Sequence, residues 1–584
     1  MNILGISALY HDAACCILRD GVLIAAAQEE RFSRIKNDPS MPYHAMQYCL
    51  KEAGITIDDV SLLSYYELPQ KKLSRQLYSG LPDVNDEILK RISPYTVEQE
   101  IAIRLGYEGP VCYVPHHLSH AASSFCFSGF NEAAILTMDG VGEWATTTYG
   151  TGRGVNIDLF EEVNYPHSVG LLYSTITSYL GFSVNEGEYK VMGLAPYGTP
   201  KYLDQFRRLL QSLDEGQFQL DLSYFDFMRQ QKMYAPALCE LFGQPARVAE
   251  SPLEQFHKDI AKSLQVFLEE LMLEKATYLY NRTGLKNLCL AGGVALNCVA
   301  NGRILREGPF DALFVQPAAN DAGGALGAAA VAYIQETGQP LPEGKLKTAC
   351  LGPAYSDKEI MNSLKGIFLK ASSFRHEPER LVKRVAELIA EGKVIGWFQG
   401  RMEFGPRALG SRSILADPRH PEMRNRINAM VKKREGFRPF APMVLEEKKG
   451  DHFELDHASP FMLETCQVKS PLDLPAITHV DGSARVQTVN REVNPLMASL
   501  LDAFDALTGC PILLNTSFNV RGEPIVCTPL DAINCFIKTD IDCLVLGNYL
   551  FYREENRMDV ISQLLELYAQ QPSDAISSQL YTFL

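Results

Sequence analysis

Two histidines four residues apart are the strongest candidates for chemistry in this sequence. His116 and His120 lie in a run of small residues that predicts a helix, and their spacing puts both imidazoles on one helical face while His117 points elsewhere. Imidazoles one turn apart can bind a single transition metal. A pair of this spacing also occurs in ordinary helix cores, so the histidines alone leave both interpretations open.

Two aspartates could complete a metal shell. Asp139 ends the apolar segment 133–138, and Asp321 follows the apolar segment 312–316 and opens a helix of small residues. Both segments predict strands, so both carboxylates lie at strand carboxyl ends, where ligands collect in open α/β sheets. Two imidazoles and two carboxylates would suit Fe2+, Zn2+ or Mn2+. An Asp at such a position can instead cap a helix, but the four residues together favour a metal.

Other polar residues also lie beside predicted strand ends. His11 lies in the turn between the first two strands, and Lys36 lies in a charged loop, where a lysine is usually only a solvated charge. Gly292 and Gly293 join a strand to a helix that begins near Asn297. Glycines at such a turn let the backbone approach a phosphate at the positive helix end. The sequence has no Gly-xxxx-Gly-Lys-Ser/Thr motif, which excludes a P-loop.

The elements around these residues follow an α/β pattern with an internal repeat. The segments 2–7, 13–18 and 22–28 predict three strands, with Asp20-Gly21 as a hairpin turn. An apolar strand, a polar turn carrying Asp and further hairpin strands recur after residue 133. The repeat predicts two related halves in the first part of the chain.

Composition indicates a soluble globular protein. The chain has 584 residues, 46% hydrophobic and 21% charged, which suits two large domains better than one. A net charge of -15 does not favour nucleic acid as a partner. The fourteen cysteines show no Cys-x-x-Cys spacing, and neither a signal peptide nor a long apolar run is present. We therefore expect reduced thiols, a cytoplasmic protein and no membrane partner.

The second part of the chain carries a local excess of positive charge. Glycines and prolines near 338–353 predict a boundary between domains of 1–345 and 355–584. Between residues 401 and 438, ten Lys or Arg stand against four acidic residues. Such a run is usually a solvated face, but here Gly, Pro and Phe separate the charges, which predicts ordered loops that direct guanidinium groups towards a phosphate. Asn515, after a predicted strand, could pair with an amide group of a ligand through both oxygen and nitrogen.

The order of the motifs resembles one known family. The chain has His-Asp near its start, then Glu-Glu-Arg-Phe, His-xxx-His-Ala, Glu-Tyr-Lys-Val-Met-Gly-Leu-Ala-Pro-Tyr-Gly, Gly-Gly-Val-Ala-Leu-Asn-Cys and Asn-Asp-x-Gly. This order is similar to that of the O-carbamoyltransferases of antibiotic biosynthesis and nodulation-factor modification, over nearly the whole chain. The resemblance implies an actin-like first domain (ASKHA, TsaD-type) with duplicated halves. It implies a YrdC-like α/β second domain.

The resemblance also implies an activity. Carbamoyl phosphate and ATP with Mg2+ would give carbamoyl adenylate in the second domain, and a hydroxyl of a small natural product would then take the carbamoyl group in the first. His11 would be the general base and Lys36 would steady the leaving phosphate, with Gly292, Gly293 and Asn297 binding nucleotide. The residues implied for carbamoyl phosphate and ATP are Arg407, Lys432 (or its neighbour Lys433), Arg438, Arg485, Asn515 and Ser517.

Two other classes of function stay open at this point. The chain could modify an adenine base in tRNA, as relatives of its first domain do, but its acidic balance argues against this. It could be a silent actin-like nucleotide-binding module, against which the retained His, Asp and Arg residues argue. Segments 65–113 and 224–242 are candidate elements for recognising an acceptor. A helix predicted after Arg553 would pack on the body or on a second subunit, which leaves a homodimer open.

Overall fold

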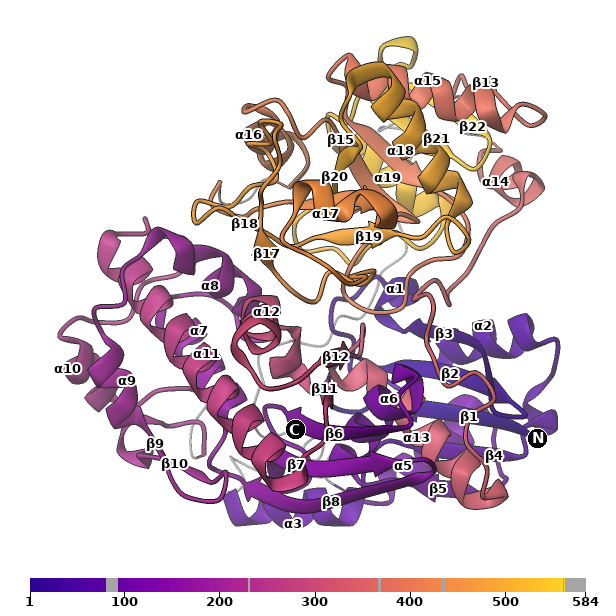
Figure 1. The fold of residues 1–584 in the computed structure, drawn as a ribbon. Helices are drawn as coiled ribbons and strands as arrows, with labels where there is room; N and C mark the ends of the chain where they lie inside the picture. The colour runs from indigo at the N-terminus through magenta and orange to yellow at the C-terminus, as the bar shows by residue number, and fades with distance from the viewer. Residues whose placement is uncertain (80–92, 229–231, 366–368, 433–435, 560, 562–584) are drawn as a thin grey trace. The chain divides into compact units, whose positions relative to one another are not determined.

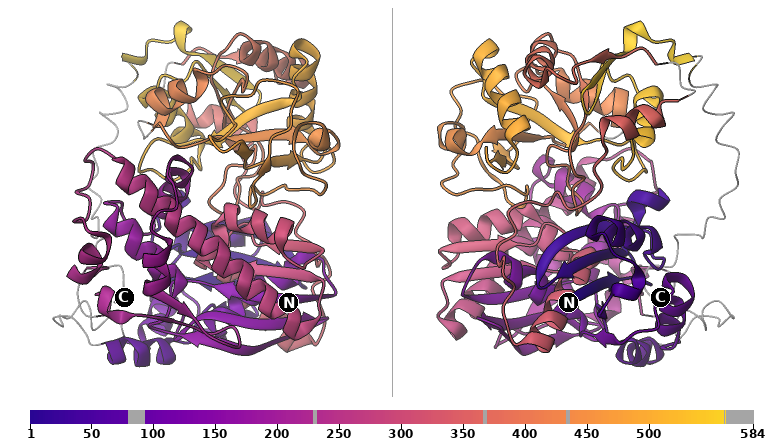
Figure 2. Two further views of the ribbon diagram at one scale, coloured as in Figure 1. Left: turned by 60° about the vertical axis from the view of Figure 1, so that its left-hand side comes forward. Right: turned by 90° about the vertical axis from the view of Figure 1, so that its right-hand side faces the viewer.

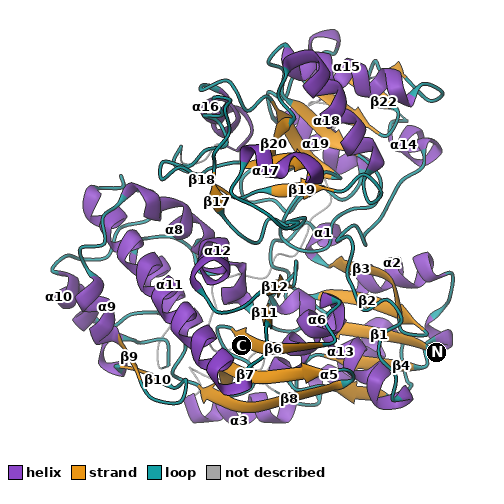
Figure 3. Ribbon diagram, in the orientation of Figure 1, coloured by secondary structure: helices purple, strands orange, loops and turns teal. Residues whose placement is uncertain are grey.

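The computed structural model describes residues 1–79, 93–228, 232–365, 369–432, 436–559 and 561 (Figure 1). They form two compact units. The first contains Met1–Ser33 and Asn37–Leu346, and the second contains Arg34–Lys36 and resumes at Lys347. Strands and helices are interspersed in both units (Figure 3), which confirms the predicted α/β class.

The first unit contains two five-stranded sheets of the same topology (Figures 1 and 2). In each, three consecutive antiparallel strands are extended by two parallel strands. The first sheet has the order β3-β2-β1-β4-β5, with β1 Asn2–Ser7, β2 Ala14–Arg19, β3 Val22–Gln28, β4 Leu62–Tyr65 and β5 Val111–Tyr113. The second has the order β12-β11-β6-β7-β8, with β6 Glu132–Met138, β7 Ala145–Arg153, β8 Asn156–Asn164, β11 Asn287–Ala291 and β12 Ala312–Val315. The repeated topology confirms the predicted duplicated, actin-like halves.

Helices α6 (His116–Ser128) and α13 (Asp321–Thr337) pack closely together in this unit. Their small residues allow the close packing, because a Cβ at Gly327 would lie only 1.7 Å from the carbonyl oxygen of Ser119. The other helices are α1 Glu30–Ser33, α2 Tyr43–Ala53, α3 Pro69–Ser79, α5 Thr96–Glu100, α7 Val169–Tyr179, α8 Glu188–Leu194, α9 Leu203–Leu209, α10 Pro236–Phe242, α11 Gln255–Thr283 and α12 Cys298–Glu307. A small hairpin joins β9 Leu210–Ser212 to β10 Phe218–Leu220.

The second unit is built on a mixed eight-stranded sheet in the order β13-β22-β21-β14-β15-β20-β16-β19. Its strands are β13 Ser372–Ser373, β14 Ile395–Phe398, β15 Arg412–Ala416, β16 Ala441–Leu445, β19 Gln487–Val489, β20 Ile512–Ser517, β21 Cys543–Leu546 and β22 Tyr549–Tyr552, and a separate pair is formed by β17 Cys466–Gln467 and β18 Ser483–Ala484. The helices are α14 Asp357–Ser363, α15 Pro378–Ala390, α16 Met423–Ile427, α17 Lys449–His452, α18 Pro495–Thr508 and α19 Pro529–Lys538. The YrdC-like assignment of this unit stays a prediction.

Two expectations from composition can be compared with the structure. All fourteen cysteines are free thiols. Within the described ranges, no helix is long and apolar enough to cross a membrane. The helix predicted after Arg553 falls largely on residues 560 and 562–584, which lie outside the described part of the chain.

Candidate metal centre and phosphate site

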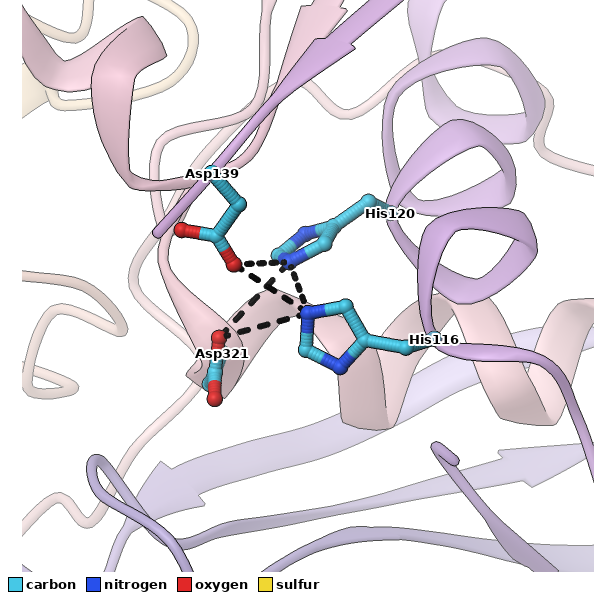
Figure 4. A group of neighbouring side chains, drawn as sticks. All are labelled: His116, His120, Asp139 and Asp321. Carbon is cyan, nitrogen blue, oxygen red and sulfur yellow. Dashed lines mark hydrogen bonds and ion pairs between the residues drawn. The ribbon is translucent and has the colours of Figure 1, made fainter. Parts of the chain in front are cut away.

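Two imidazoles and two carboxylates converge in the first unit (Figure 4). Asp139 follows β6 and Asp321 follows β12, and both strands run parallel to β11, so their carboxyl ends share one edge. The Nε2 atoms of His116 and His120 lie 3.1 Å apart, and Asp139 Oδ2 lies 3.1 and 3.2 Å from them. Asp321 Oδ1 is 3.8 Å from the first and 3.6 Å from the second.

This spacing fits a single metal ion. Bonds of about 2.1 Å place the ligand atoms of a tetrahedral site roughly 3.4 Å apart. Asp321 is fully buried, and its Oδ1 has no hydrogen-bond partner among the described residues. Burial acts to raise the pKa of Asp139, but hydrogen bonds from His116 and His120 hold that pKa well below its usual range. A divalent cation would compensate the negative charge of these buried carboxylates and would bind the imidazole nitrogens that face them.

The third histidine of the helix is turned away from the cluster. His117 Nδ1 lies 2.6 Å from Thr137 Oγ1, and its Nε2 lies 2.8 Å from the carbonyl oxygen of Ala145. Burial lowers the pKa of His117 to about 3, so this imidazole is neutral. His117 therefore anchors α6 to the second sheet.

The predicted glycine turn contacts the cluster directly. The amide of Gly293 donates to Asp139 Oδ1 over 3.0 Å. Gly292 has a φ of +91°, and a Cβ there would lie 2.2 Å from the carbonyl oxygen of Met138. Only glycine fits so close an approach. Asn297 caps α12 and pairs with Gln265 through both side-chain atoms, so its side chain has a local structural role, and nucleotide binding by Asn297 stays a prediction.

The structure places His11 beside the cluster. Its Nε2 lies 3.9 Å from Asp321 Oδ2 and its Nδ1 lies 2.9 Å from Asp12 Oδ2. Burial lowers the pKa of His11, but Asp321 and Asp12 raise it more strongly, to about 10. A divalent cation held by Asp321 would weaken that effect. Lys36 groups with the second unit, so the two predicted catalytic residues belong to different units.

Glu143 is a part of the site that the sequence did not predict. Its Oε1 accepts hydrogen bonds from the amide of Leu68 over 2.8 Å and from the amide of His116 over 2.9 Å. The second of these amides belongs to the first turn of α6, where helix amides lack internal partners. Glu143 thereby fixes the start of the histidine helix and the segment that leads into α3. An acidic residue four positions after Asp139 was the only signal in the sequence.

In the second unit, Glu403 shapes the loop that carries Arg407. One oxygen of this buried carboxylate accepts hydrogen bonds from the amides of Leu409, Ser411 and Arg412, over 2.7, 2.8 and 3.1 Å. In the sequence, Glu403 is only one of the four acidic residues among the basic ones. Its three hydrogen bonds explain why the loop is ordered.

Positive charge also gathers around Arg485, between β18 and β19. Burial, together with the charges of Arg485 and Arg424, lowers the pKa of His479 to about 4 against the opposing effect of Asp481. The imidazole is therefore neutral, with two guanidinium groups close by. Arg438 lies between the described π-helical turn Asn428–Lys432 and β16. The side chain of Lys432 and the whole of Lys433 lie outside the described residues.

Only the amide nitrogen of the Asn515 side chain is hydrogen-bonded among the described residues. Its Nδ2 donates to the carbonyl oxygen of Ala408 over 3.0 Å and to Gln487 Oε1 over 2.9 Å. Its Oδ1 is buried and has no partner among the residues that the structure describes. The prediction that Asn515 could use both atoms is thus narrowed to the oxygen, which can only accept. Ser517, at the end of the same strand, donates to Asn519 Oδ1 over 2.8 Å.

Comparison with known families matches both units. The profile for "Carbamoyltransferase N-terminus" matches residues 2–330, and that for "Carbamoyltransferase C-terminus" matches residues 386–553. The chain belongs to the carbamoyltransferase family. This confirms the resemblance found in the sequence motifs.

Several relatives of this carbamoyltransferase match over most of their length. An uncharacterized protein of Synechocystis is 47% identical over 94% of this chain and 96% of its own length. Nodulation protein NolNO of Sinorhizobium fredii is 42% identical over 92% of this chain and 78% of its own. Nodulation protein NolO of Bradyrhizobium diazoefficiens is 43% identical over 74% of this chain and 78% of its own.

Proposed function

We propose that this carbamoyltransferase is an ATP-dependent O-carbamoyltransferase that carries out two reactions on one chain. Carbamoyl phosphate, ATP and one water give carbamoyl adenylate, pyrophosphate and phosphate. A hydroxyl of a small natural product of antibiotic type then takes the carbamoyl group, and AMP leaves. The observation that carries the proposal is the presence, in one member of the family, of a buried His-His-Asp-Asp cluster and a cationic segment in separate units.

The second unit would form the adenylate. Arg407, Arg438 and Arg485 would bind phosphate oxygens of ATP and carbamoyl phosphate, because guanidinium forks match phosphate and stabilise the charge that develops there. Lys432 and Ser517 would add further contacts, and Mg2+ would accompany ATP. The unpartnered Oδ1 of Asn515 would accept a hydrogen bond from the carbamoyl NH2 group.

The first unit would carry out the transfer. His116, His120, Asp139 and Asp321 would hold Fe2+, Zn2+ or Mn2+, which when bound would polarise the carbamoyl group or anchor phosphate oxygens. His11 would remove the proton of the acceptor hydroxyl as its oxygen attacks the carbonyl carbon. The bond between this carbon and the phosphate oxygen of AMP then breaks. The glycine turn at Gly292 and Gly293 would bind the nucleotide. Lys36 groups with the second unit, so its role at the departing phosphate stays a prediction from the sequence.

The test is an assay without acceptor. Purified protein is incubated with ATP, Mg2+ and carbamoyl phosphate, pyrophosphate release is followed, and carbamoyl adenylate is sought by mass spectrometry. We expect the adenylate to form and Arg438→Ala to prevent it. Arg491→Ala is the matched control, because Arg491 is half exposed and pairs with Glu447 and Asp502 on the surface of the same unit. If metal-replete protein makes no adenylate, the proposal is wrong.

A further inference from the structure

Helix α3 buries its polar face instead of its apolar one. Lys72, Arg75 and Gln76 are buried, and their spacing places them on one side of the helix. Leu77 and Tyr78 on the other side are 57% and 63% exposed. An ordinary surface helix has the opposite pattern. The buried face of α3 therefore borders a site that requires polar groups.

Arg75 is a buried cation without a charged partner in the part of the chain that the structure describes. The residue is 3% exposed, and its side chain forms no ion pair or hydrogen bond with any described residue. Its guanidinium lies 5.6 Å from the ring centroid of Tyr165. A buried charge is costly unless a partner compensates it. The Arg75 guanidinium is therefore poised to bind an anion.

Arg247 shows how the same fold treats a structural arginine. Its guanidinium lies 5.1 Å from the ring centroid of Phe182, which resembles the arrangement of Arg75 on Tyr165. Unlike Arg75, it donates to the carbonyl oxygen of Leu180 over 2.8 Å and to that of Ser251 over 3.0 and 2.6 Å. The comparison sets Arg75 apart from an arginine that holds loops together.

Lys72 adds a second cation on the same face. Its Nζ lies 2.8 Å from Glu67 Oε1 and 5.0 Å from the ring centroid of Tyr10. Glu67 offsets one of the two buried positive charges on α3 and leaves the other for a ligand. An oxyanion would find a guanidinium fork and an ammonium group on one helical face.

This face lies beside the metal cluster, within the first unit. Burial raises the pKa of Tyr10, Arg75 lowers it, and Asp321 and Asp139 raise it further, so the guanidinium and both cluster carboxylates act on one hydroxyl. Glu143 binds the amides of Leu68 and His116 together, which fixes the start of α3 against the histidine helix. The anion would therefore belong to a ligand that also reaches the cluster.

We propose that Arg75 and Lys72 form an anion subsite beside the metal cluster, and that a ligand of the first unit places a phosphate, sulfate or carboxylate group there. The proposal rests on the proposed function, in which the first unit binds carbamoyl adenylate and an acceptor. The oxyanion belongs to one of these two molecules. In the first case the subsite holds the phosphate of the AMP part, and in the second the natural product itself is anionic.

The test uses inorganic phosphate and AMP as probes on the full-length chain. All proteins carry Arg438→Ala, which weakens the phosphate site of the second unit, and the unfolding temperature is measured against probe concentration. We expect phosphate to raise the unfolding temperature of the Arg438→Ala parent. Arg75→Met should unfold at the same or a higher temperature without phosphate, because it removes a buried charge that no described residue compensates. It should also lose most of the phosphate-dependent rise. Arg247→Met should lower the unfolding temperature throughout and keep the rise.

The outcomes separate the possible roles of Arg75. If Arg75→Met lowers the unfolding temperature as Arg247→Met does and keeps the phosphate-dependent rise, Arg75 is structural and the subsite is absent. If AMP raises the temperature more than phosphate does and Arg75→Met removes the difference, the oxyanion is that of the donor. If phosphate raises the temperature through Arg75 and AMP does not, the oxyanion belongs to the acceptor. Acceptor-free pyrophosphate release, measured on the wild-type protein, shows separately whether the adenylate forms, so failure of the adenylate assay is distinct from failure of the subsite.

Discussion

The Nε2 atoms of His116 and His120 face each other across 3.1 Å at the centre of a buried cluster. Two imidazole lone pairs at this distance repel unless a proton or a metal cation lies between them. Two carboxylates on the same side add negative charge, so a divalent cation compensates the cluster more completely than one proton.

The first prediction concerns metal content. Wild-type protein equilibrated with Fe2+, Zn2+ or Mn2+ should hold one ion per chain after gel filtration, as measured by plasma mass spectrometry. Asp321→Ala should weaken binding by at least about tenfold, since removing even an outer partner of a metal ligand costs that much. His117→Gln is the matched control on α6, because His117 bonds to Thr137 and Ala145 and should leave the metal in place. Metal retained fully by Asp321→Ala would contradict the assignment.

The second prediction separates the two reactions. His11→Asn should abolish carbamoyl transfer to an acceptor while acceptor-free formation of carbamoyl adenylate survives, because His11 belongs to the first unit and the cationic segment to the second. The amide of Asn can hydrogen-bond but cannot serve as a general base. Mass spectrometry of both products gives the answer. Loss of both reactions in a folded variant would rule out this division of roles.

The third prediction tests the carbamoyl contact of Asn515. Asn515→Leu removes the unpartnered Oδ1 and should lower kcat/KM for carbamoyl phosphate by roughly 10- to 100-fold, the range of one lost hydrogen bond in a buried site. The KM for ATP should change little. Gln487→Leu removes one partner of Asn515 Nδ2 but leaves Oδ1, so its effect should be smaller. An equal loss for both substrates would indicate general damage to the site.

The fourth prediction is a pH dependence of stability in the second unit. A hydrogen bond to Glu464, 2.9 Å away, is the largest cause that raises the pKa of His457 to about 9. Because the folded pKa exceeds the unfolded value of about 6.5, the stabilisation is complete below that value and is lost as the pH rises through 9.

The His457 side chain is 44% exposed, so solvent screening limits the effect of its pairing to about 1 kcal/mol or less. His457→Gln should lower the unfolding temperature at pH 6, and the difference from wild type should vanish near pH 10. Glu464→Gln should show the same profile, and the double variant should be no less stable than either single one. A difference that persists at pH 10 would show that His457 stabilises by packing instead of charge.

Much of the first unit could be predicted because its signals are local. The strands that end at Asp139 and Asp321 are continuous apolar runs, and the His116–His120 pair follows helical spacing, so each residue could be placed at a sheet edge or on a helix face. The repeated strand pattern indicated two halves. These features depend on neighbours in the chain, which a sequence displays directly.

The sequence did not predict contacts between residues far apart in the chain. It also did not predict a helix that buries its charged residues. Glu143 bonds to Leu68 across 75 residues, and no periodicity connects them. Arg75 lies in a short helix where burial of a cation contradicts the usual amphipathic pattern. The availability of a single atom of Asn515 depends on Gln487 and Ala408, which reach it from other segments. All three features depend on tertiary packing, which the sequence does not display.

The hydrogen bonds of Glu143 also bear on how such an enzyme could acquire new substrates. One oxygen accepts hydrogen bonds from the backbone amides of Leu68, just before α3, and of His116, in the first turn of α6. Because these bonds involve backbone amides, the start of the segment after Leu68 is fixed whatever side chains that segment carries. Insertions or replacements between α3 and β5 could then arise during evolution while the two histidines keep their positions. Ligand preference would then change through the segment between α3 and β5, and the metal cluster would stay the same.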